Sequence, residues 1–452
     1  MTSGTTRYFA DHAWLGPLGE GDGLARDVLI EVTGDRFTAV RPDAVRPPDA
    51  VQLAGLTLPG LANAHSHAFH RALRGRTHRG GGTFWTWRED MYALAERLTP
   101  DSYLALARAT YAEMALAGIS CVGEFHYLHH APGGHRYADP NAMTDALVTA
   151  AAEAGIRITL LDTCYLTGGP DRPLAGPQLR FGDGDADSWA ARAAAYRTPD
   201  HARLGAAIHS VRAVPADQLG TVADWARERE APLHVHLSEQ RAENEACLAA
   251  HGCTPTELLD RRGALGPRTT AVHATHLTEA DIARLGSSRT SVCLTPTTER
   301  DLADGIGPAP ELARAGSPLT LGSDSNAVID LLEEARALEL DERLRSETRG
   351  HWAAADLLAA ATAAGHASLG WPDAGRIAPG ALADLTTLSL DSVRLAGWQP
   401  RTLLESAVFA AASADVSDVV VGGRIIVAEG RHRLLGDVAG ELHRAITGPA
   451  RT

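Results

Sequence analysis

Four short apolar segments of this chain are each followed directly by histidine or aspartate, and this pattern restricts the fold more than any other feature. The residues at the segment ends are His65 and His67, then His236, His273 and Asp324. Apolar runs of this length are typical of parallel strands that are buried on both faces. Because the carboxyl ends of parallel barrel strands meet at one mouth, we expect these polar side chains to lie close together there.

The first of these segments, residues 59–67, places two imidazoles on one side of a strand end. Residues i and i+2 of an extended chain point the same way, so His65 and His67 can bind one ion while Leu58 and Leu61 enter the core. One such pair is a weak signal in a chain with 20 histidines. Imidazole and carboxylate ligands at several strand ends, however, suit Zn²⁺ with an open position for water. The combined pattern predicts a catalytic metal site.

These motifs resemble the amidohydrolase superfamily, and the similarity runs from the first strand of the barrel to the C-terminus. In its mononuclear deaminase branch, the ligands are both histidines of the first motif, a strand-5 histidine three residues before an acid, and the strand-8 aspartate. The resemblance therefore implies one divalent ion, Zn²⁺ or alternatively Fe²⁺, held by His65, His67, His236 and Asp324. His234 is then not a ligand, and we expect it to position its strand or to stay neutral in the core.

The expected fold is α/β: a (β/α)8 TIM-like barrel of the amidohydrolase type over residues 59–375, with a small β-sandwich domain built from both termini, residues 1–58 and 376–452. Strand patterns on both sides of the barrel, and Ala-rich helical stretches that alternate with apolar runs inside it, agree with this fold. The strand candidates are 28–32, 36–40, 51–53, 384–388, 418–421 and 424–427, and the clearest helices are 103–117 and 142–154. We expect residues 357–369 to form a packed helix and Gly-rich residues 168–184 to form an active-site loop.

Composition excludes several classes of protein. The chain has no lysine, so its 42 basic residues are all arginine, and a lysine that bridges two metals or carries a pyridoxal cofactor is impossible. A net charge of -14 without a basic stripe argues against nucleic acid as a partner. The chain has no 18-residue apolar span and no signal-peptide pattern, and its five cysteines are scattered. We expect a cytoplasmic homodimer that acts on a small molecule, with no membrane partner.

The metal site predicts hydrolysis, because bound Zn²⁺ makes hydroxide available near neutral pH. Asp324, as a ligand beside the water, can accept its proton. Glu239 lies three residues after His236 and can pass a proton to a substrate nitrogen, although a solvated helix start is the alternative for this residue. His273 is expected to stabilise the hydroxide or the charge that develops at the attacked carbon.

Residues at the expected barrel mouth indicate the substrate. The segments that contain Arg88, Tyr127, His209 and Arg212 resemble the formimidoylglutamate deiminases of this superfamily, which convert N-formimino-L-glutamate to N-formyl-L-glutamate and ammonia in histidine degradation. By position, the resemblance implies that His209 and Arg212 bind one substrate carboxylate and that Arg88 and Tyr127 bind the other. Guanidinium groups suit such a dicarboxylate because they bind carboxylates through two parallel hydrogen bonds. This chain has His70 where these enzymes commonly have glutamine, which leaves that contact open.

Two other functions remain open from the sequence. Another deaminase of the same branch, acting on guanine, an adenosine-like nucleoside or a triazine, would need aromatic stacking and amide contacts instead of paired arginines. A non-catalytic assembly protein is a second alternative, but such relatives tend to lose metal ligands, and this chain keeps all four. Salt bridges within the protein are the alternative role for Arg88 and Arg212, and simple packing is the alternative for Tyr127.

Overall fold

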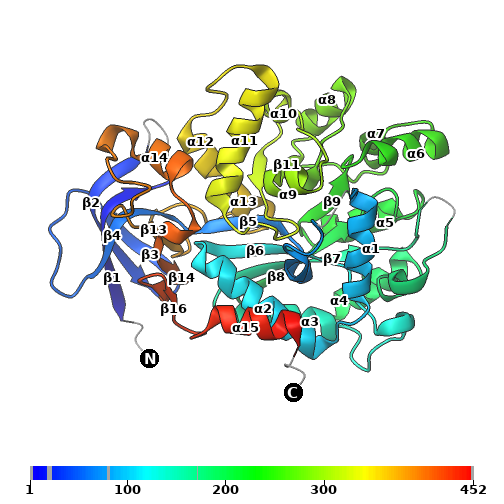
Figure 1. Ribbon diagram of the computed structural model, residues 1–452, viewed down its shortest axis with the longest axis horizontal. Coiled ribbons are helices and arrows are strands. Elements are labelled where there is room, and N and C mark those ends of the chain that lie inside the picture. Colours follow the sequence, from blue (N-terminus) through cyan, green and yellow to red (C-terminus); the bar gives the residue numbers. More distant parts are fainter. Residues whose placement is uncertain (1–3, 18–22, 79–81, 170–171, 449–452) are drawn as a thin grey trace.

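The computed structural model describes residues 4–17, 23–78, 82–169 and 172–448, and these residues form a parallel barrel with a second sheet at one side (Figure 1). The barrel sheet has eight described strands in the order β12-β11-β10-β9-β8-β7-β6-β5, so each strand pairs with the next one along the chain. The strands are β5 (Leu61–Ser66), β6 (Ile119–His126), β7 (Arg157–Cys164), β8 (Ala202–Ile208), β9 (Leu233–Leu237), β10 (Thr269–His273), β11 (Ser291–Leu294) and β12 (Leu319–Leu321).

Backbone hydrogen bonds beyond the last strand bring the two ends of this sheet together. The amide of Asp324 donates to the carbonyl of His65, and the amide of His67 donates to the carbonyl of Asp324, both at 3.0 Å. Every residue of β5, β6 and β7 is buried, as expected of parallel strands that are covered on both faces. The four apolar segments that precede histidine or aspartate in the sequence are β5, β9, β10 and β12 of this barrel.

Helices surround the barrel. They are α1 (Phe84–Ala95), α2 (Pro100–Leu116), α3 (Ala142–Ala154), α4 (Ala186–Ala195), α5 (Leu219–Glu228), α6 (Arg241–His251), α7 (Pro255–Arg261), α8 (Glu279–Ser287), α9 (Pro296–Asp301), α10 (Ala309–Ala315) and α11 (Leu331–Ser346). The expected helix over 357–369 is present as α12 (Ala354–Ala359), a π-helical turn (Ala360–Ala364) and α13 (Gly365–Ser368). None of the described helices is both long and apolar enough to cross a membrane.

Both termini build the second sheet, in the order β16-β15-β14-β13-β4-β1-β2-β3. Its strands are β1 (Thr5–Trp14), β2 (Leu24–Thr33), β3 (Arg36–Arg41), β4 (Val51–Pro59), β13 (Leu385–Leu388), β14 (Val416–Val421), β15 (Arg424–Ala428) and β16 (Arg431–His432). The expected fold class, a barrel with a β domain from both termini, is confirmed. Sequence analysis did not predict β1, whose residues mix apolar and polar side chains without regular alternation.

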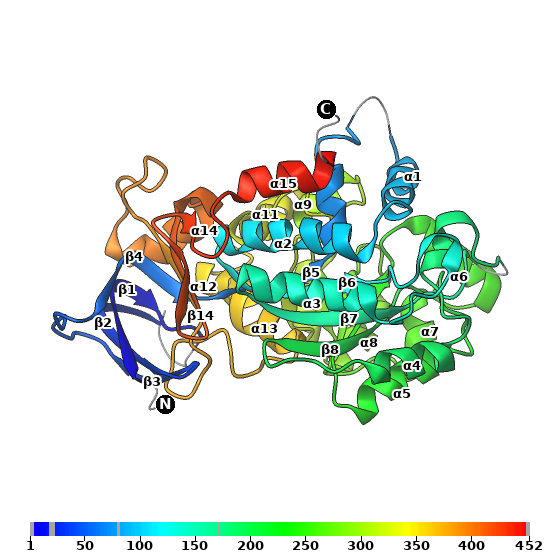
Figure 2. The ribbon, with the colours of Figure 1, turned by 90° about the horizontal axis from the view of Figure 1, so that it is seen from below.

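The expected sandwich takes the form of one continuous sheet that curls over its own core. The amide of Phe37 on β3 donates to Ala381 at 3.0 Å, and the hydroxyl of Tyr8 on β1 donates to the carbonyl of Gly423 beyond β14 at 2.9 Å. Two helices of the C-terminal segment pack on the barrel instead. These are α14 (Leu403–Ala410), against α11 and α12, and α15 (Val438–Thr447), which lies along α2 (Figure 2).

A buried ion pair joins the barrel to the second sheet. Arg157, the first residue of β7, donates from Nε and Nη2 to the two carboxylate oxygens of Asp384, at 2.9 and 3.2 Å. The same carboxylate accepts a hydrogen bond from the amide of Gly422, and the carbonyl of Asp384 accepts one from the amide of Gly60. Gly60 links β4 directly to β5, and an added Cβ there would lie 2.3 Å from Ser120 Oγ. The two sheets therefore meet in a rigid, close-packed joint.

We expect Asp384→Asn to lower the free energy of unfolding by about 3–5 kcal/mol, because it leaves the buried Arg157 guanidinium without its carboxylate. Urea unfolding followed by circular dichroism measures this. Asp224→Asn is the matched control, since Asp224 pairs with Arg227 on the surface, with more than half of each side chain exposed, and exposed pairs contribute at most about 1 kcal/mol. Equal losses in the two variants would contradict a structural role for the buried pair.

Candidate metal centre and active site

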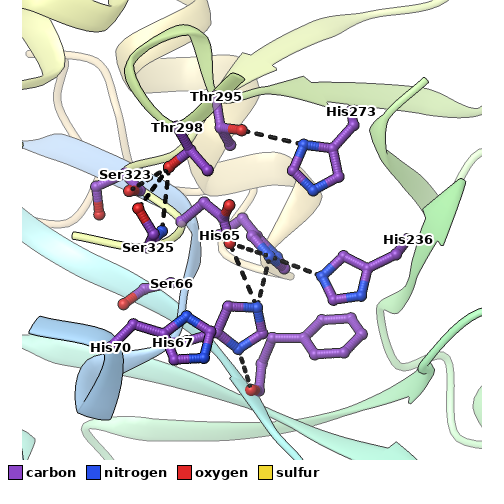
Figure 3. Close-up of polar contacts among 12 residues, drawn as sticks. His65, Ser66, His67, His70, His236, His273, Thr295, Thr298, Ser323 and Ser325 are labelled. Atoms are coloured by element: carbon purple, nitrogen blue, oxygen red, sulfur yellow. Dashed lines mark hydrogen bonds and ion pairs between the residues drawn. The ribbon is translucent and has the colours of Figure 1, made fainter. Parts of the chain in front are cut away.

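Four buried side chains converge at the mouth of the barrel. His65 and Ser66 are the last two residues of β5, His67 follows them, and His236 lies on β9 (Figure 3). Asp324 follows β12. One potential ligand atom from each lies within 4.8 Å of all the others, and within the described residues no other group of three or more such side chains does this. His65 Nε2 is 3.2 Å from His67 Nε2, 3.1 Å from His236 Nε2 and 3.2 Å from Asp324 Oδ1. Ligands at about 2.0–2.1 Å from a tetrahedral ion are about 3.3–3.4 Å apart.

The protonation of these side chains also fits a metal ion. His67 Nδ1 lies 2.9 Å from the carbonyl oxygen of Phe125, which can only accept, so Nδ1 carries the hydrogen and Nε2 offers its lone pair to the cluster. Burial lowers the pKa of His65, His67 and His236, so these rings are neutral. Burial alone would raise the pKa of Asp324, but the neighbouring imidazoles outweigh it and hold that pKa below its usual range. Neutral imidazoles around one carboxylate are a donor set for a divalent cation.

The backbone turns sharply at the ends of β9, β10 and β12, three of the strands that bring side chains to this site. Ser238, His273 and Asp324 have φ angles of 51°, 68° and 42°, in the left-handed region that non-glycine residues seldom adopt. Asn326, with φ 56°, donates from Nδ2 to the carbonyl of His67 at 3.0 Å. Asn63 Oδ1 accepts from the amide of Ser323 at 2.9 Å. Backbone strain of this kind persists where surrounding contacts enforce it, as these do beside Asp324.

His273 and Glu239 lie next to each other beside the cluster. His273 Nε2 is 3.8 Å from Glu239 Oε1, and His273 Nδ1 is 3.5 Å from Glu299 Oε1 and 3.2 Å from Thr295 Oγ1. Burial alone would lower the pKa of His273, but Glu239, Glu299 and Asp324 outweigh it and raise that pKa to about 10. Burial raises the pKa of Glu239, partly opposed by His273 and Arg212. A carboxyl that holds a proton readily therefore lies beside an imidazolium cation.

A cavity of about 590 Å³ opens over the cluster, and the structure brings the expected substrate-binding residues to its wall. Arg88 reaches it from α1, Tyr127 follows β6, His209 follows β8, and Arg212 lies in the loop after His209. His67, His236, Glu239, His273 and Asp324 line the same cavity. The loop expected at 168–184 borders it through Gly168, Gly169, Arg172 and Phe181, although residues 170 and 171 lie outside the described part of the chain.

The two arginines differ in their surroundings. Arg212 Nη2 is 3.6 Å from Glu239 Oε2, and Arg212 Nε is 3.7 Å from Glu243 Oε2, so the salt-bridge alternative applies to this residue. Arg88 has no ion pair with any described carboxylate, and its guanidinium lies 4.5 Å from the centre of the Trp85 ring. Arg88 is therefore a cation of this cavity whose charge no described carboxylate balances by direct pairing, and Arg172 at the cavity border has no such ion pair either.

Three other sequence-based expectations can be compared with the contacts. Glu239 is buried, so it is not a solvated helix start. The Tyr127 hydroxyl lies 3.0 Å from His70 Nε2, so its polar end is satisfied within the protein. His234 Nε2 lies 3.2 Å from the carbonyl oxygen of Ser368, and burial lowers the pKa of His234 to about 3. His234 is thus neutral and apart from the ligand cluster.

Sequence reasoning missed several residues at this site. Glu243 lies four residues after Glu239 at the start of α6, and that spacing was the available signal. Glu299 lies in α9, and sequence analysis gave it no role. Tyr92, Tyr165 and Gln178 carried no signal, because isolated tyrosines and glutamines are common on any protein surface.

Comparison with known proteins identifies the family. Residues 56–426 match the model of the amidohydrolase family. The chain is 38% identical to formimidoylglutamate deiminase of Pseudomonas aeruginosa, covering 94% of this chain and 95% of that protein. It is 31% identical to 8-oxoguanine deaminase of the same organism, covering 83% of each. The crystal structure of an amidohydrolase from Brucella melitensis superposes with a TM-score of 0.89 at 33% identity, covering 98% of this chain and 99% of that one. This chain belongs to the amidohydrolase family of hydrolytic enzymes, as its strand-end motifs predict.

Proposed function

We propose that this enzyme hydrolyses N-formimino-L-glutamate to N-formyl-L-glutamate and ammonia, a reaction of histidine degradation. The observation that carries the proposal is the unpaired Arg88 in the same cavity as Glu239 and Asp324. The substrate carries two carboxylates and a formamidinium cation, so it needs both cations and anions in one pocket. The relative named formimidoylglutamate deiminase, 38% identical over most of the chain, supports the same substrate.

In this proposal His65, His67, His236 and Asp324 hold one divalent ion, Zn²⁺ or, as the alternative, Fe²⁺. The ion would lower the pKa of water from about 15.7 towards about 7, which supplies a nucleophile at neutral pH. A second ion bridged by a carboxylated lysine is excluded, because the chain contains no lysine.

The protein's own acids and bases carry the protons. Asp324 accepts a proton from the attacking water, and Glu239 delivers one to the nitrogen that leaves as ammonia. The raised pKa of Glu239 suits this task, since the residue must hold a proton and then release it. The His273 cation stabilises negative charge near the attacked carbon. The water supplies the new formyl oxygen, and the imino nitrogen departs with its hydrogens.

Residues at the rim bind the rest of the substrate. Arg88 and Tyr127 bind one carboxylate, and His209 with Arg212 binds the other. The guanidinium of Arg212 faces the carboxylates of Glu239 and Glu243, which hold it in place. The formamidinium cation lies against the carboxylates at the bottom of the cavity. Opposite charges thus alternate from the metal cluster to the mouth, as a zwitterionic substrate requires.

A purine deaminase is the second candidate. It is supported by the 31% identity to 8-oxoguanine deaminase and by the aromatic rings of Phe84, Trp85 and Trp87 at the cavity wall. A neutral purine would leave Arg88 without a partner, which favours the dicarboxylate. Ammonia release from N-formimino-L-glutamate, guanine, an adenosine nucleoside and a chlorinated triazine, measured side by side, separates these candidates.

We also propose that the enzyme works in the cytoplasm as a homodimer, with no nucleic-acid or membrane partner. The five cysteines are free and buried, and the net charge of -14 disfavours phosphate backbones. Sedimentation equilibrium of the purified protein measures the oligomeric state directly.

We expect one divalent ion per chain by elemental analysis of the purified protein. His236→Ala should lose this ion, because one of four ligands is removed. His234→Ala is the matched control on the same strand, and it should keep the ion. Two ions per chain, or equal loss in both variants, would contradict the assigned ligand set.

We expect Glu239→Gln to retain the metal while kcat falls by about 10²–10⁴-fold, the usual contribution of a general acid or base. The amide has the same shape but cannot deliver the proton. Glu245→Gln, an exposed residue on α6, is the control and should behave as wild type. A kcat for Glu239→Gln within a few-fold of wild type would remove this residue from the mechanism.

We expect Arg88→Met to raise KM for N-formimino-L-glutamate at least about tenfold with little change in kcat. A charge-assisted hydrogen bond contributes about 1.5–3 kcal/mol, and its carboxylate partner is charged equally in the ground and transition states. Arg97→Met, an exposed arginine beyond α1, is the control.

Arg212→Met should lower kcat as well as raise KM, because Arg212 also faces Glu239.

A substrate in which the carboxylate assigned to Arg88 is converted to an amide provides the decisive comparison. If the wild-type enzyme turns over this neutral analogue as well as the parent compound, the dicarboxylate assignment is wrong.

A further inference from the structure

Gln178 lies in a short 3-10 helix, η3 (Gly176–Arg180), within the Gly-rich loop whose role the sequence did not reveal. We propose that Gln178 is a positioning residue that aligns the two carboxylate-binding sides of the cavity with each other. This inference rests on the proposed function. Gln178 is not itself among the residues that line the cavity, so it acts through its neighbours.

One amide group joins two pocket tyrosines. Gln178 Nε2 donates to Tyr92 Oη at 3.0 Å and to Tyr165 Oη at 3.1 Å, and the two hydroxyl oxygens are 3.4 Å apart. Gln178 is 9% exposed, so water competes little for these hydrogen bonds. An added Cβ on Gly168 would lie 2.9 Å from Gln178 Oε1, so the backbone of the loop at Gly168 packs closely against the side-chain amide.

Each tyrosine leads to one of the proposed carboxylate-binding sides. Tyr92 lies one helical turn after Arg88 on α1, and its ring centre is 5.5 Å from the Arg88 guanidinium carbon. Tyr165 follows β7, and its ring centre is 4.3 Å from that of His209. In the proposed function, Arg88 and His209 bind different carboxylates of the substrate. The Gln178 amide is therefore a direct link between the helix that carries one side and the barrel strand that supports the other.

The helix η3 is itself firmly anchored. Arg180, which is fully buried, donates to the carbonyl oxygens of Leu98 at 2.7 Å and His130 at 2.8 Å, and also to that of Ala95. Ala95 is the last residue of α1, so the arginine satisfies carbonyl groups at the C-terminal end of this helix, where a cation is favoured. The backbone carbonyl of Arg180 accepts hydrogen bonds from the amides of His129 and His130.

The helix α1 depends on such contacts, because only Phe84, Met91 and Ala95 along it are buried. A surface helix with a narrow buried face has little packing to determine its rotation. Without the Gln178 amide, Tyr92 loses a hydrogen-bond donor and the orientation of Arg88 becomes less defined. The chemistry at the metal cluster lies deeper in the barrel and keeps its geometry. The consequence therefore falls on substrate binding.

Gln178→Leu, which keeps the size and removes the amide, tests this proposal. We expect KM for N-formimino-L-glutamate to rise about five- to tenfold, as for the loss of one or two hydrogen bonds, with kcat within about twofold of wild type. The dissociation constant of the product N-formyl-L-glutamate, measured by calorimetry, should rise by the same factor. Gln52→Leu is the control, since Gln52 Nε2 donates to Asp11 in the terminal sheet, away from the cavity.

A double-mutant cycle with Tyr92→Phe/Tyr165→Phe supplies the second readout. These changes remove both acceptors and keep both rings, so Gln178→Leu should have no further effect on KM in that background. Additive effects would overturn the proposal, and so would a lowered melting temperature of Gln178→Leu with an unchanged KM. If Gln178→Leu does not fold, Tyr92→Phe and Tyr165→Phe singly should each raise KM, and unchanged values in both would overturn it. Failure of the wild-type enzyme to release ammonia from N-formimino-L-glutamate would instead overturn the proposed function itself.

Discussion

The hydrogen bonds that close the barrel between β5 and the residues after β12 are the constraint on which the rest of this structure depends. They pair the backbone of Asp324 with that of His65 and His67, residues separated by more than 250 positions in the chain. Without this closure, the carboxylate and the first two imidazoles would lie at opposite edges of an open sheet. The left-handed backbone at Asp324 is the strained conformation that this joint imposes.

Burial acts differently on the two halves of the site. At the ligand cluster it keeps the histidines neutral, which leaves their lone pairs free for a cation. Beside this cluster, the three carboxylates around His273 outweigh the effect of burial on its pKa and stabilise an imidazolium. The difference lies in the number of anions, because a buried charge is stable only beside an opposite one. The proposed metal binding and the proposed proton transfer can therefore be assigned to neighbouring residues with different charge states.

The rim of the cavity is built less rigidly than its bottom. Strands that are buried on both faces carry the candidate ligands His65 and His236, whereas Arg88 comes from a helix with a narrow buried face. Hydrogen bonds from η3 compensate for this sparse packing. Substrate specificity in such a barrel can therefore vary at the rim while the hydrolytic centre stays constant, because loops after the strands tolerate change that the closed sheet does not.

The sequence by itself predicted the barrel and placed histidines and an aspartate at its strand ends, because both follow from local geometry, whereas the choice of His236 as a ligand came from the resemblance to a family. Alternation along an extended strand puts His65 and His67 on one side, and buried apolar runs locate the strand ends. It also excluded a lysine-bridged second metal. Only the tertiary structure decided which arginine is paired, since Glu243 faces Arg212 from another element while no described carboxylate pairs with Arg88. The role of Gln178 likewise depends on tyrosines from two distant segments. Such contacts arise from how elements pack in space, and residue spacing along the chain carries no record of them.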